Sequence, residues 1–213
     1  MKLNEHITNH IVWSHSDNVS EIFERIFAQN LWQSTESVSG KGSEISAANN
    51  LLKQLPALLK KYDIKTVTDA PCGDYNWAQH LNYKFEQYTG IDIVEKLIEN
   101  NKKYETDCIK FLTGDIINCK LPQSDLILCR DCFIHLTFEQ IKEALKNFKN
   151  SKSKYILTNT YDINSNTDVL TGQFRKINLL LTPFNFPEPL EIIVEDKQDK
   201  KLIALWKQED ICL

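Results

Sequence analysis

The sequence predicts an α/β fold built on a mostly parallel β-sheet, and three observations support this prediction. Short apolar runs alternate with helical stretches after Asp63, as the crossovers between parallel strands require. The chain is 42% hydrophobic and 25% charged, which is typical of a globular protein and unlike a disordered chain. Its 213 residues correspond to about one and a half average domains, so we expect one sheet domain with extra segments.

The first 62 residues are predicted to form helices and a loop that cover a sheet domain of residues 63–213. Apolar residues recur at helical spacing from Val19 to Trp32 and again from Ser43 to Leu59, where Pro56 is expected to kink or restart the second helix. The intervening STESVSGKGS is rich in serine and glycine and predicts a mobile loop. We expect this loop to act as a lid over a pocket.

Seven strand-length runs are expected in the second part of the chain. The predicted parallel strands are Thr66 to Ala70, Gln87 to Ile93, Ile109 to Thr113, Asp125 to Arg130 and Tyr155 to Thr160. The predicted helices between them are Tyr75 to Leu81, Val94 to Tyr104 and Phe138 to Phe148. Leu190 to Glu195 and Lys201 to Lys207 flank the turn residues DKQDK, which predicts an antiparallel hairpin at the sheet edge.

Charge and cysteine usage argue against several classes of partner. The 25 basic and 29 acidic residues give a net charge of -4, which disfavours nucleic acid as the main partner. No apolar run approaches the roughly 20 residues of a membrane span, and the first residues lack the apolar stretch of a signal peptide, so a cytoplasmic protein without a membrane partner is expected. The six cysteines are irregularly spaced, and Cys129-x-x-Cys132 lacks a second Cys/His pair, so we expect reduced thiols and no metal site.

Three aspartates follow successive predicted strands. The first strand ends in Asp69-Ala70-Pro71-Cys72-Gly73, at the turn where parallel sheets bind ligands. Asp92 lies 92 − 69 = 23 residues further on, close to the offset of roughly 20 at which an acidic group accepts hydrogen bonds from a ribose diol. Asp115 ends the third strand, where a carboxylate would accept from the exocyclic amine of adenine. Together they predict a nucleoside pocket, the alternative for each aspartate being a helix cap.

In this ordered set the chain resembles the class I S-adenosylmethionine-dependent methyltransferases, whose first motif is usually Asp/Glu-x-Gly-x-Gly-x-Gly. The resemblance covers about residues 64–207 and departs from the motif at Pro71 and Tyr75, where glycines are common. It implies a Rossmann-like sheet of seven strands, S-adenosylmethionine as cofactor and S-adenosylhomocysteine as product. The cofactor-binding residues it implies are Asp69, Pro71, Cys72, Gly73, Trp77, Asp92, Ile93, Asp115 and Arg130. Because proline has no N–H, the cradle is expected to rely on the amides of Cys72 and Gly73.

Arg130, Asp131 and His135 follow the fourth strand, where the resemblance places catalytic residues that face the methyl group and its acceptor. A hydroxyl acceptor needs a general base, for which His135 or Asp131 is the candidate, whereas an ionised phosphate or carboxylate needs mainly a cationic clamp. The chain has 3 arginines beside 22 lysines, and the placement of Arg130 and Arg175 predicts bidentate recognition of a small anion. Alternatively, Arg130 pairs with Asp131 or a helix end and Arg175 is a surface residue.

The sequence therefore predicts O-methylation of a small anionic or hydroxyl-bearing metabolite by a monomer or homodimer, with Trp32, Tyr161 and Arg175 as substrate contacts. A weak resemblance to methyltransferases of capsular O-methyl phosphoramidate synthesis implies a role in surface-polysaccharide or other tailoring biosynthesis. An NAD(P)-dependent reductase fits Asp92 equally well, but the chain has no Gly-x-Gly-x-x-Gly and no Tyr-x-x-x-Lys. A non-catalytic nucleoside-binding module is the third alternative.

Overall fold

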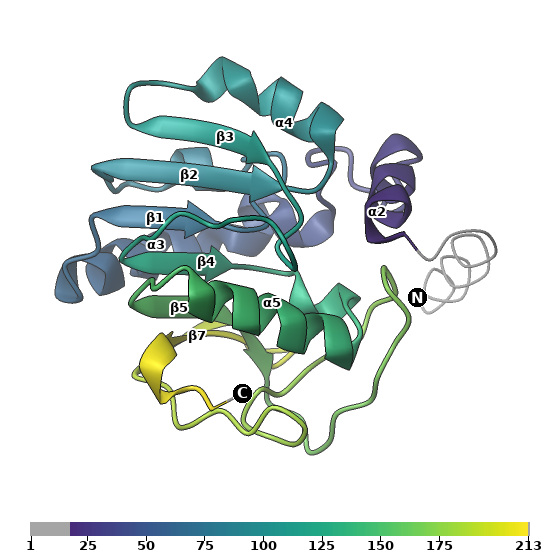
Figure 1. Ribbon diagram of the computed structural model, residues 1–213, viewed down its shortest axis with the longest axis vertical. Helices are drawn as coiled ribbons and strands as arrows, with labels where there is room; N and C mark the ends of the chain where they lie inside the picture. The colour runs from purple at the N-terminus through teal and green to yellow at the C-terminus, as the bar shows by residue number, and fades with distance from the viewer. Residues whose placement is uncertain (1–17, 213) are drawn as a thin grey trace.

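The computed structural model describes residues 18–212, which form a seven-stranded sheet with helices on both faces (Figure 1). The strands are β1 (Thr66–Asp69), β2 (Gln87–Asp92), β3 (Ile109–Thr113), β4 (Leu126–Cys129), β5 (Tyr155–Tyr161), β6 (Glu191–Asp196) and β7 (Lys201–Lys207). The α-helices are α2 (Val19–Ala28), α3 (Ile45–Lys61), α4 (Glu95–Asn101) and α5 (Phe138–Asn150). Among these residues no helix is long and apolar enough to span a bilayer.

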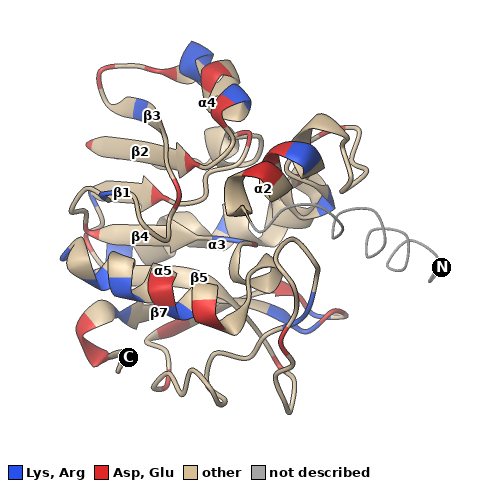
Figure 2. Cartoon of the chain, turned by 45° about the vertical axis from the view of Figure 1, so that its right-hand side comes forward, with Lys and Arg blue, Asp and Glu red and all other residues tan. Residues whose placement is uncertain are grey.

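The strand order is β3-β2-β1-β4-β5-β7-β6, and β1 to β5 pair in parallel. β7 lies antiparallel between β5 and β6, so the predicted hairpin and the predicted fold class are confirmed. The strand order reverses between β1 and β4, because β2 and β3 are added on one side of β1 and β4 and β5 on the other. Ligands of such sheets bind beyond the carboxyl ends of the strands at this point. Acidic residues, drawn in red, mark the ends of β1 and β2 at this edge (Figure 2).

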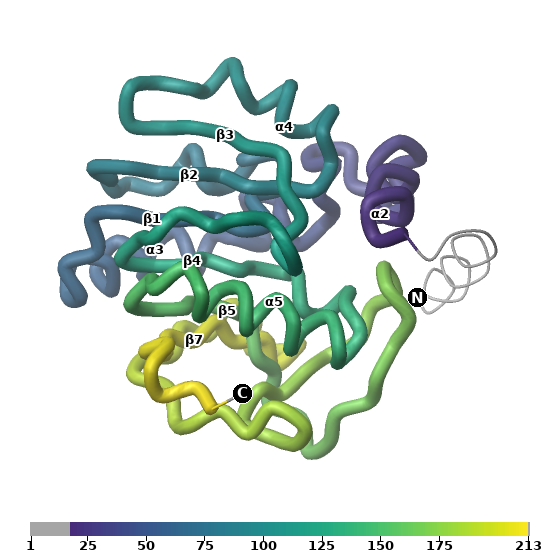
Figure 3. Tube along the Cα trace, in the orientation of Figure 1, coloured from purple at the N-terminus to yellow at the C-terminus, as the bar shows by residue number. Residues whose placement is uncertain are grey.

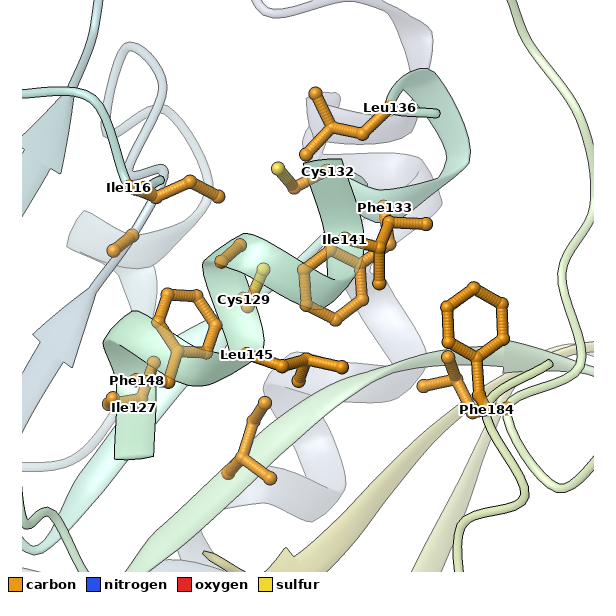
Figure 4. Packing of buried hydrophobic residues seen from close by; sticks show 14 of the residues in the cluster. Ile116, Ile127, Cys129, Cys132, Phe133, Leu136, Ile141, Leu145, Phe148 and Phe184 are labelled. Atoms are coloured by element: carbon orange, nitrogen blue, oxygen red, sulfur yellow. The ribbon is translucent and has the colours of Figure 1, made fainter. Parts of the chain in front are cut away.

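The helix α5 covers one face of the sheet. Thr137 begins it with a capping box, because its hydroxyl accepts from the Gln140 amide and the Gln140 side chain accepts from the Thr137 amide. Ile141, Leu145 and Phe148 follow at helical spacing and pack toward the strand residues Ile127 and Cys129 (Figure 4). Each buried side chain of this size stabilises the fold by about 1.5–3 kcal/mol. The amphipathic pattern in the sequence is thus sufficient to place this helix.

The helices α3 and α4 cover the opposite face. Leu51, Leu55 and Leu59 of α3 join the same hydrophobic cluster as Leu97 and Ile98 of α4. The helix α3 is continuous through Pro56, so the predicted restart does not occur, and its N-cap is Glu44 and not Ser43. Because α3 packs on the sheet, the segment predicted as a cover contributes part of the core.

The predicted helix from Tyr75 to Leu81 is wrong. Only a short 3-10 turn, Ala78–His80, forms there. Tyr75 adopts a φ of 61°, in the left-handed region that no α-helix accepts, and its buried ring packs against Tyr88 and Phe111 at centroid distances of 5.1 Å. Tertiary packing of this aromatic ring therefore outweighs the helical pattern.

Candidate active site

A cavity of about 1260 Å³ opens at the carboxyl edge of the sheet. The helix α2 lies beyond these strand ends (Figure 3), and the segment between α2 and α3 forms part of the cavity wall. The site residues predicted from the sequence all line this cavity: Trp32, Asp69, Pro71, Cys72, Gly73, Trp77, Asp92, Ile93, Asp115, Arg130, Asp131, His135, Tyr161 and Arg175. The structure thus brings all of these residues together at one cavity. Their individual roles stay predictions.

Asp92 ends β2 with its side chain buried at the cavity wall. Its Oδ2 accepts a hydrogen bond from the Gly73 amide at 3.1 Å, and its Oδ1 accepts one from the Val94 amide at 3.0 Å. A carboxylate has about four acceptor positions, so the Asp92 oxygens can accept from a further donor. Burial raises the pKa of Asp92 to about 6, against the opposing effect of the backbone donors. Asp92 is ionised at neutral pH and can accept from a diol.

Asp69 ends β1 and is more deeply buried than Asp92. The Tyr88 hydroxyl donates to its Oδ2. Burial raises the pKa of Asp69 to about 7, although this hydrogen bond and the nearby Arg130 charge favour the ionised form. Asp69 therefore lines the cavity as a buried carboxyl group whose pKa is raised toward neutral pH.

The turn from Pro71 to Gly73 does not offer its amides to a ligand. The Cys72 amide donates to the Ile91 carbonyl at 2.9 Å, and the Gly73 amide donates to Asp92. The prediction that these two amides form the cradle is therefore wrong, because both are satisfied within the protein. Gly73 instead supplies space: its φ is 56°, and an added Cβ would lie 2.5 Å from the Ser39 hydroxyl oxygen.

The segment before α3 is closed over this turn. The Ser37 hydroxyl and the Val38 amide donate to Oδ2 of Asp74 at 2.8 and 3.0 Å, and the Asp74 amide donates to the Ser39 hydroxyl at 2.8 Å. Each contact joins residues at least 35 positions apart. This segment is the predicted lid region, and the structure shows it seated on the first-strand turn.

Asp115 follows β3 by two residues and makes local hydrogen bonds. Its Oδ1 accepts from the Ile117 amide at 2.9 Å, and its Oδ2 accepts from the Asn118 side chain at 3.3 Å. The capping alternative thus describes its contacts, although its side chain also lines the cavity. Its contact with adenine stays a prediction.

Arg130 is not available as an anion clamp. Its Nε donates to Glu195 Oε1 at 2.6 Å, its Nη2 donates to the same oxygen and to the Gly42 carbonyl, and its Nη1 lies 3.3 Å from Asp131. The guanidinium carbon lies 5.2 Å from the centre of the Trp77 ring, which is buried at the cavity wall. The alternative that Arg130 pairs with Asp131 is confirmed, with the unpredicted Glu195 as its main partner.

Glu195, Asn159 and Lys201 complete a buried polar network that the sequence interpretation missed. Asn159 donates to Glu195 Oε2 at 2.7 Å and accepts from the Asp131 amide at 2.7 Å. Lys201 lies 2.7 Å from Asp131 Oδ2 and 3.4 Å from Glu195. The one available signal was the alternation of β6, which puts Glu195 on the same face as the buried Ile193.

Asp131 is held in an unusual conformation by this network. Its φ is 53°, which is rare for a residue other than glycine. Such a conformation persists where the surrounding contacts hold the residue in place. Burial opposes its ionisation, but the charges of Arg130 and Lys201 outweigh this and keep the pKa of Asp131 below its ordinary value. Its Oδ1 is buried and has no hydrogen-bond partner among the described residues. Asp131 is therefore a fixed carboxylate with one unused acceptor atom.

Arg175 is neither a surface residue nor a partner of Arg130 in a clamp. Its side chain is buried, with Nη1 donating to the Phe133 carbonyl and Nη2 donating to the Leu136 carbonyl at 2.8 Å. Burial lowers the pKa of Arg175 to about 10. The Nε atom has no partner among the described residues. Arg175 thus fixes the 3-10 turn that carries His135.

His135 lies at the end of that turn, Phe133–His135. Its Nδ1 is 3.1 Å from the Gln173 carbonyl, and its ring stacks on Trp32 with centroids 5.0 Å apart and planes 28° apart. Burial lowers the pKa of His135 to about 4, so the ring is neutral at pH 7. With Nδ1–H donated to the carbonyl, the Nε2 lone pair can accept a proton. Tyr161, at the end of β5, is buried at the same cavity, and burial raises its pKa far above the ordinary value.

Residues 67–152 match the family described as a methyltransferase domain. No match was found among curated proteins. The structure is similar to human N-acetylserotonin methyltransferase in complex with S-adenosylmethionine, with a TM-score of 0.62 and 12% identity over 91% of this chain and 60% of that one. It is also similar to magnesium protoporphyrin IX methyltransferase from Synechocystis PCC 6803, with a TM-score of 0.60 and 13% identity over 91% and 99% of the two chains.

A third similar structure is the methyltransferase domain of bacterial CtHen1, with a TM-score of 0.56 and 17% identity over 75% of this chain and 98% of that domain. At these identities the likeness concerns the fold, including the seven-stranded sheet with its antiparallel hairpin. The chain therefore has the Rossmann-like α/β fold of these methyltransferases and matches a methyltransferase domain over residues 67–152.

Proposed function

We propose that this protein is an S-adenosylmethionine-dependent methyltransferase that acts on the oxygen of a small metabolite. The observation that carries the proposal is one large cavity beside β1 and β4, which Asp69 and Asp92 line from the ends of β1 and β2 and His135 lines from the 3-10 turn after β4. The methyltransferase-domain match over residues 67–152 supports the same reaction class.

The residues present fit the cofactor. The Asp92 carboxylate lines the cavity and can accept from a ribose hydroxyl, and Trp77 and Ile93 give apolar walls. The cavity of about 1260 Å³ exceeds the roughly 300–1,000 Å³ of one drug-sized ligand, which leaves room for an acceptor beside the cofactor. When bound, S-adenosylmethionine supplies a methyl group on a sulfonium centre. The protein's part is to align the acceptor and to remove its proton.

A hydroxyl acceptor fits the site better than an anion. Both guanidinium groups that were expected to clamp an anion donate to protein atoms, Arg130 to Glu195 and Arg175 to two carbonyls. His135 is neutral and can hold the hydroxyl proton at Nε2, with the Asp131 carboxylate beside it to stabilise the imidazolium. A role in capsule or surface-polysaccharide tailoring stays an implication of the sequence resemblance.

Isothermal titration with S-adenosylhomocysteine and S-adenosylmethionine tests the proposal. We expect binding of both at micromolar concentrations and no binding of NADPH. An absence of binding of either compound at millimolar concentration contradicts the proposal, and binding of NADPH alone supports the reductase. If both bind but no methylated product forms from any hydroxyl compound by mass spectrometry, the non-catalytic module is the better description.

A further inference from the structure

One end of the cavity is walled by aromatic rings that come from three distant parts of the chain. Trp32 follows α2, His135 follows β4, and Phe174 lies in the long segment after β5. His135 stacks on Trp32 at 5.0 Å, and its ring centre lies 6.1 Å from that of Phe174 with the planes tilted by 56°. We call this set the ring wall.

Phe174 is not explained by the core. It is 46% exposed, so it is not a member of the buried hydrophobic clusters, and it lines the cavity. A large aromatic side chain exposed at a cavity, beside further apolar residues such as Ile134 and Leu136, is typical of a ligand contact. Its function is therefore to be sought in the cavity.

Backbone hydrogen bonds join the two segments of the ring wall that carry His135 and Phe174. The Gly172 amide donates to the His135 carbonyl at 2.7 Å, and the Arg175 amide donates to the Ile134 carbonyl at 3.0 Å. These bonds fix the segment that carries Phe174 against the turn that carries His135. A preformed wall of this kind loses little conformational entropy when a flat ligand binds to it.

The charged groups next to the ring wall already have partners within the protein. Asp131 lies between Arg130 and Lys201, and the Arg175 guanidinium donates to the Phe133 and Leu136 carbonyls. An anionic ligand would have to break these contacts to obtain a bidentate partner, whereas an uncharged ring would leave them intact.

We propose that the ring wall binds the methyl acceptor, and that this acceptor is an uncharged compound with a flat π-electron ring that carries a hydroxyl group. The assignment of this end of the cavity to the acceptor rests on the proposed methyltransferase function. The ring packs against Trp32 and Phe174, and its hydroxyl lies within reach of His135. Offset-stacked and edge-to-face contacts of aromatic rings give a preference for flat compounds over saturated ones of equal size.

Titration calorimetry with three matched probes tests this inference, with and without saturating S-adenosylhomocysteine. The probes are 2-naphthol, its saturated analogue decahydro-2-naphthol and the anion 2-naphthyl phosphate. We expect 2-naphthol to bind at least tenfold more tightly than either of the others. Equal binding of the saturated analogue removes the ring preference, and tighter binding of the phosphate shows an anion site; either result overturns the proposal.

Variants of the ring wall test whether 2-naphthol binds there. Trp32→Leu and Phe174→Leu should each weaken 2-naphthol at least fivefold and change S-adenosylhomocysteine affinity less than twofold, while Trp32→Phe should retain most of the naphthol affinity. Phe85→Leu, in a half-buried ring outside the cavity, is the matched control. The exposed Phe174 gives a usable variant even if Trp32→Leu does not fold. Naphthol affinity that Phe174→Leu leaves unchanged overturns the ring wall, whereas naphthol binding without any S-adenosylhomocysteine binding overturns only the proposed function.

Discussion

The two halves of the cavity are built in different ways. Around Asp92 the polar contacts join residues close in sequence: the carboxylate accepts from Val94, two residues away, and from Gly73, 19 residues away. Around Asp131 they join residues far apart in sequence: Arg130 donates to Glu195, 65 residues away, and to Gly42, 88 residues away. The half around Asp92, which we propose binds the cofactor and call the cofactor half, thus follows from local strand-to-turn structure. The half around Asp131 and His135, which we propose binds the acceptor and call the acceptor half, forms only when the lid, the β4 turn and the β6–β7 hairpin come together.

This difference implies that side chains can be substituted more freely in the acceptor half than in the cofactor half. Strand ends fix the donors and acceptors of the cofactor half, since the sheet register places Asp69 opposite Gly90 and Leu128. The acceptor half depends on segments outside the regular sheet, where side chains change without disturbing the ladder. Substrate choice is therefore expected to reside in Trp32, Phe174 and their neighbours.

The largest expected effect comes from breaking the network that joins the acceptor half. Glu195→Ala leaves the Arg130 guanidinium buried without its main carboxylate, and removing one partner of a buried pair costs about 3–5 kcal/mol. Urea unfolding followed by circular dichroism measures this loss. The control is Glu209→Ala, which removes the exposed Lys207–Glu209 pair and should cost no more than about 1 kcal/mol. Equal losses would mean that the network does not hold the acceptor half together.

The next effect concerns the burial of His135. The ordinary pKa of 6.5 is lowered to about 4 by burial, a difference of about 3 kcal/mol in the relative stability of the two protonation states. NMR titration of labelled histidines should show this ring neutral from pH 8 down to about 5, with the signal assigned through His135→Gln. Trp32→Ala uncovers the ring and should raise its pKa. A wild-type midpoint between pH 6 and 7 would indicate an open, solvated acceptor half.

A smaller effect is expected in the cofactor half. Asp92→Asn removes a charged acceptor and should weaken S-adenosylhomocysteine binding by about 1.5–3 kcal/mol. Because the ionised form accepts from the diol and burial raises the pKa of Asp92 to about 6, wild-type affinity should be constant above pH 7 and fall as the pH drops below about 6. The variant should lack this fall.

Calorimetry at several pH values measures both results. Asp107→Asn is the matched control, because this exposed aspartate lies just before β3 and outside the cavity. Wild-type affinity that does not change between pH 5 and 7 would show that Asp92 does not contact the cofactor.

The smallest expected effect concerns the seam between the two halves, where the lid lies on Gly73. Gly73→Ala should cost about 1–2 kcal/mol, because an alanine is strained at a φ of 56° and its methyl group would lie 2.5 Å from the Ser39 hydroxyl oxygen. Ser39→Gly in the same chain removes the collision and leaves the backbone strain. A double-mutant cycle in urea should therefore give a non-additive term of about 1 kcal/mol. Strict additivity would mean that the lid is not seated on this turn in solution.

The regular parts of the fold could be predicted from the sequence because their signals are local. The runs for β3 and β7 have the predicted bounds; β1, β2 and β5 differ from them by one residue at one end, and β4 and β6 by one residue at each end. The predicted helix at Tyr75 failed because one residue with a positive φ, fixed by packing against Tyr88 and Phe111, ends any α-helix. Local pattern could not reveal that packing.

The two arginines show the same limit in the candidate site. The scarcity of arginine in the sequence drew attention to Arg130 and Arg175 as site residues, and both line the cavity. Beyond the Arg130–Asp131 pair, their partners were not predicted, because Glu195 lies 65 residues from Arg130 and the carbonyls that Arg175 contacts lie about 40 residues away. Pairing over such separations depends on the sheet order and not on the neighbouring residues.

The sequence by itself determined the parallel sheet with its terminal hairpin and the strand-end aspartates, because hydrophobic periodicity and turn residues act over a few positions. Only the tertiary structure decided that the amides of Cys72 and Gly73 are internally bonded, that both expected clamp arginines are paired, and that Trp32 and Phe174 meet at His135. The physical reason is that buried polar groups and exposed rings take whichever partners the fold brings within a few ångströms. Those partners come from segments that no local pattern connects.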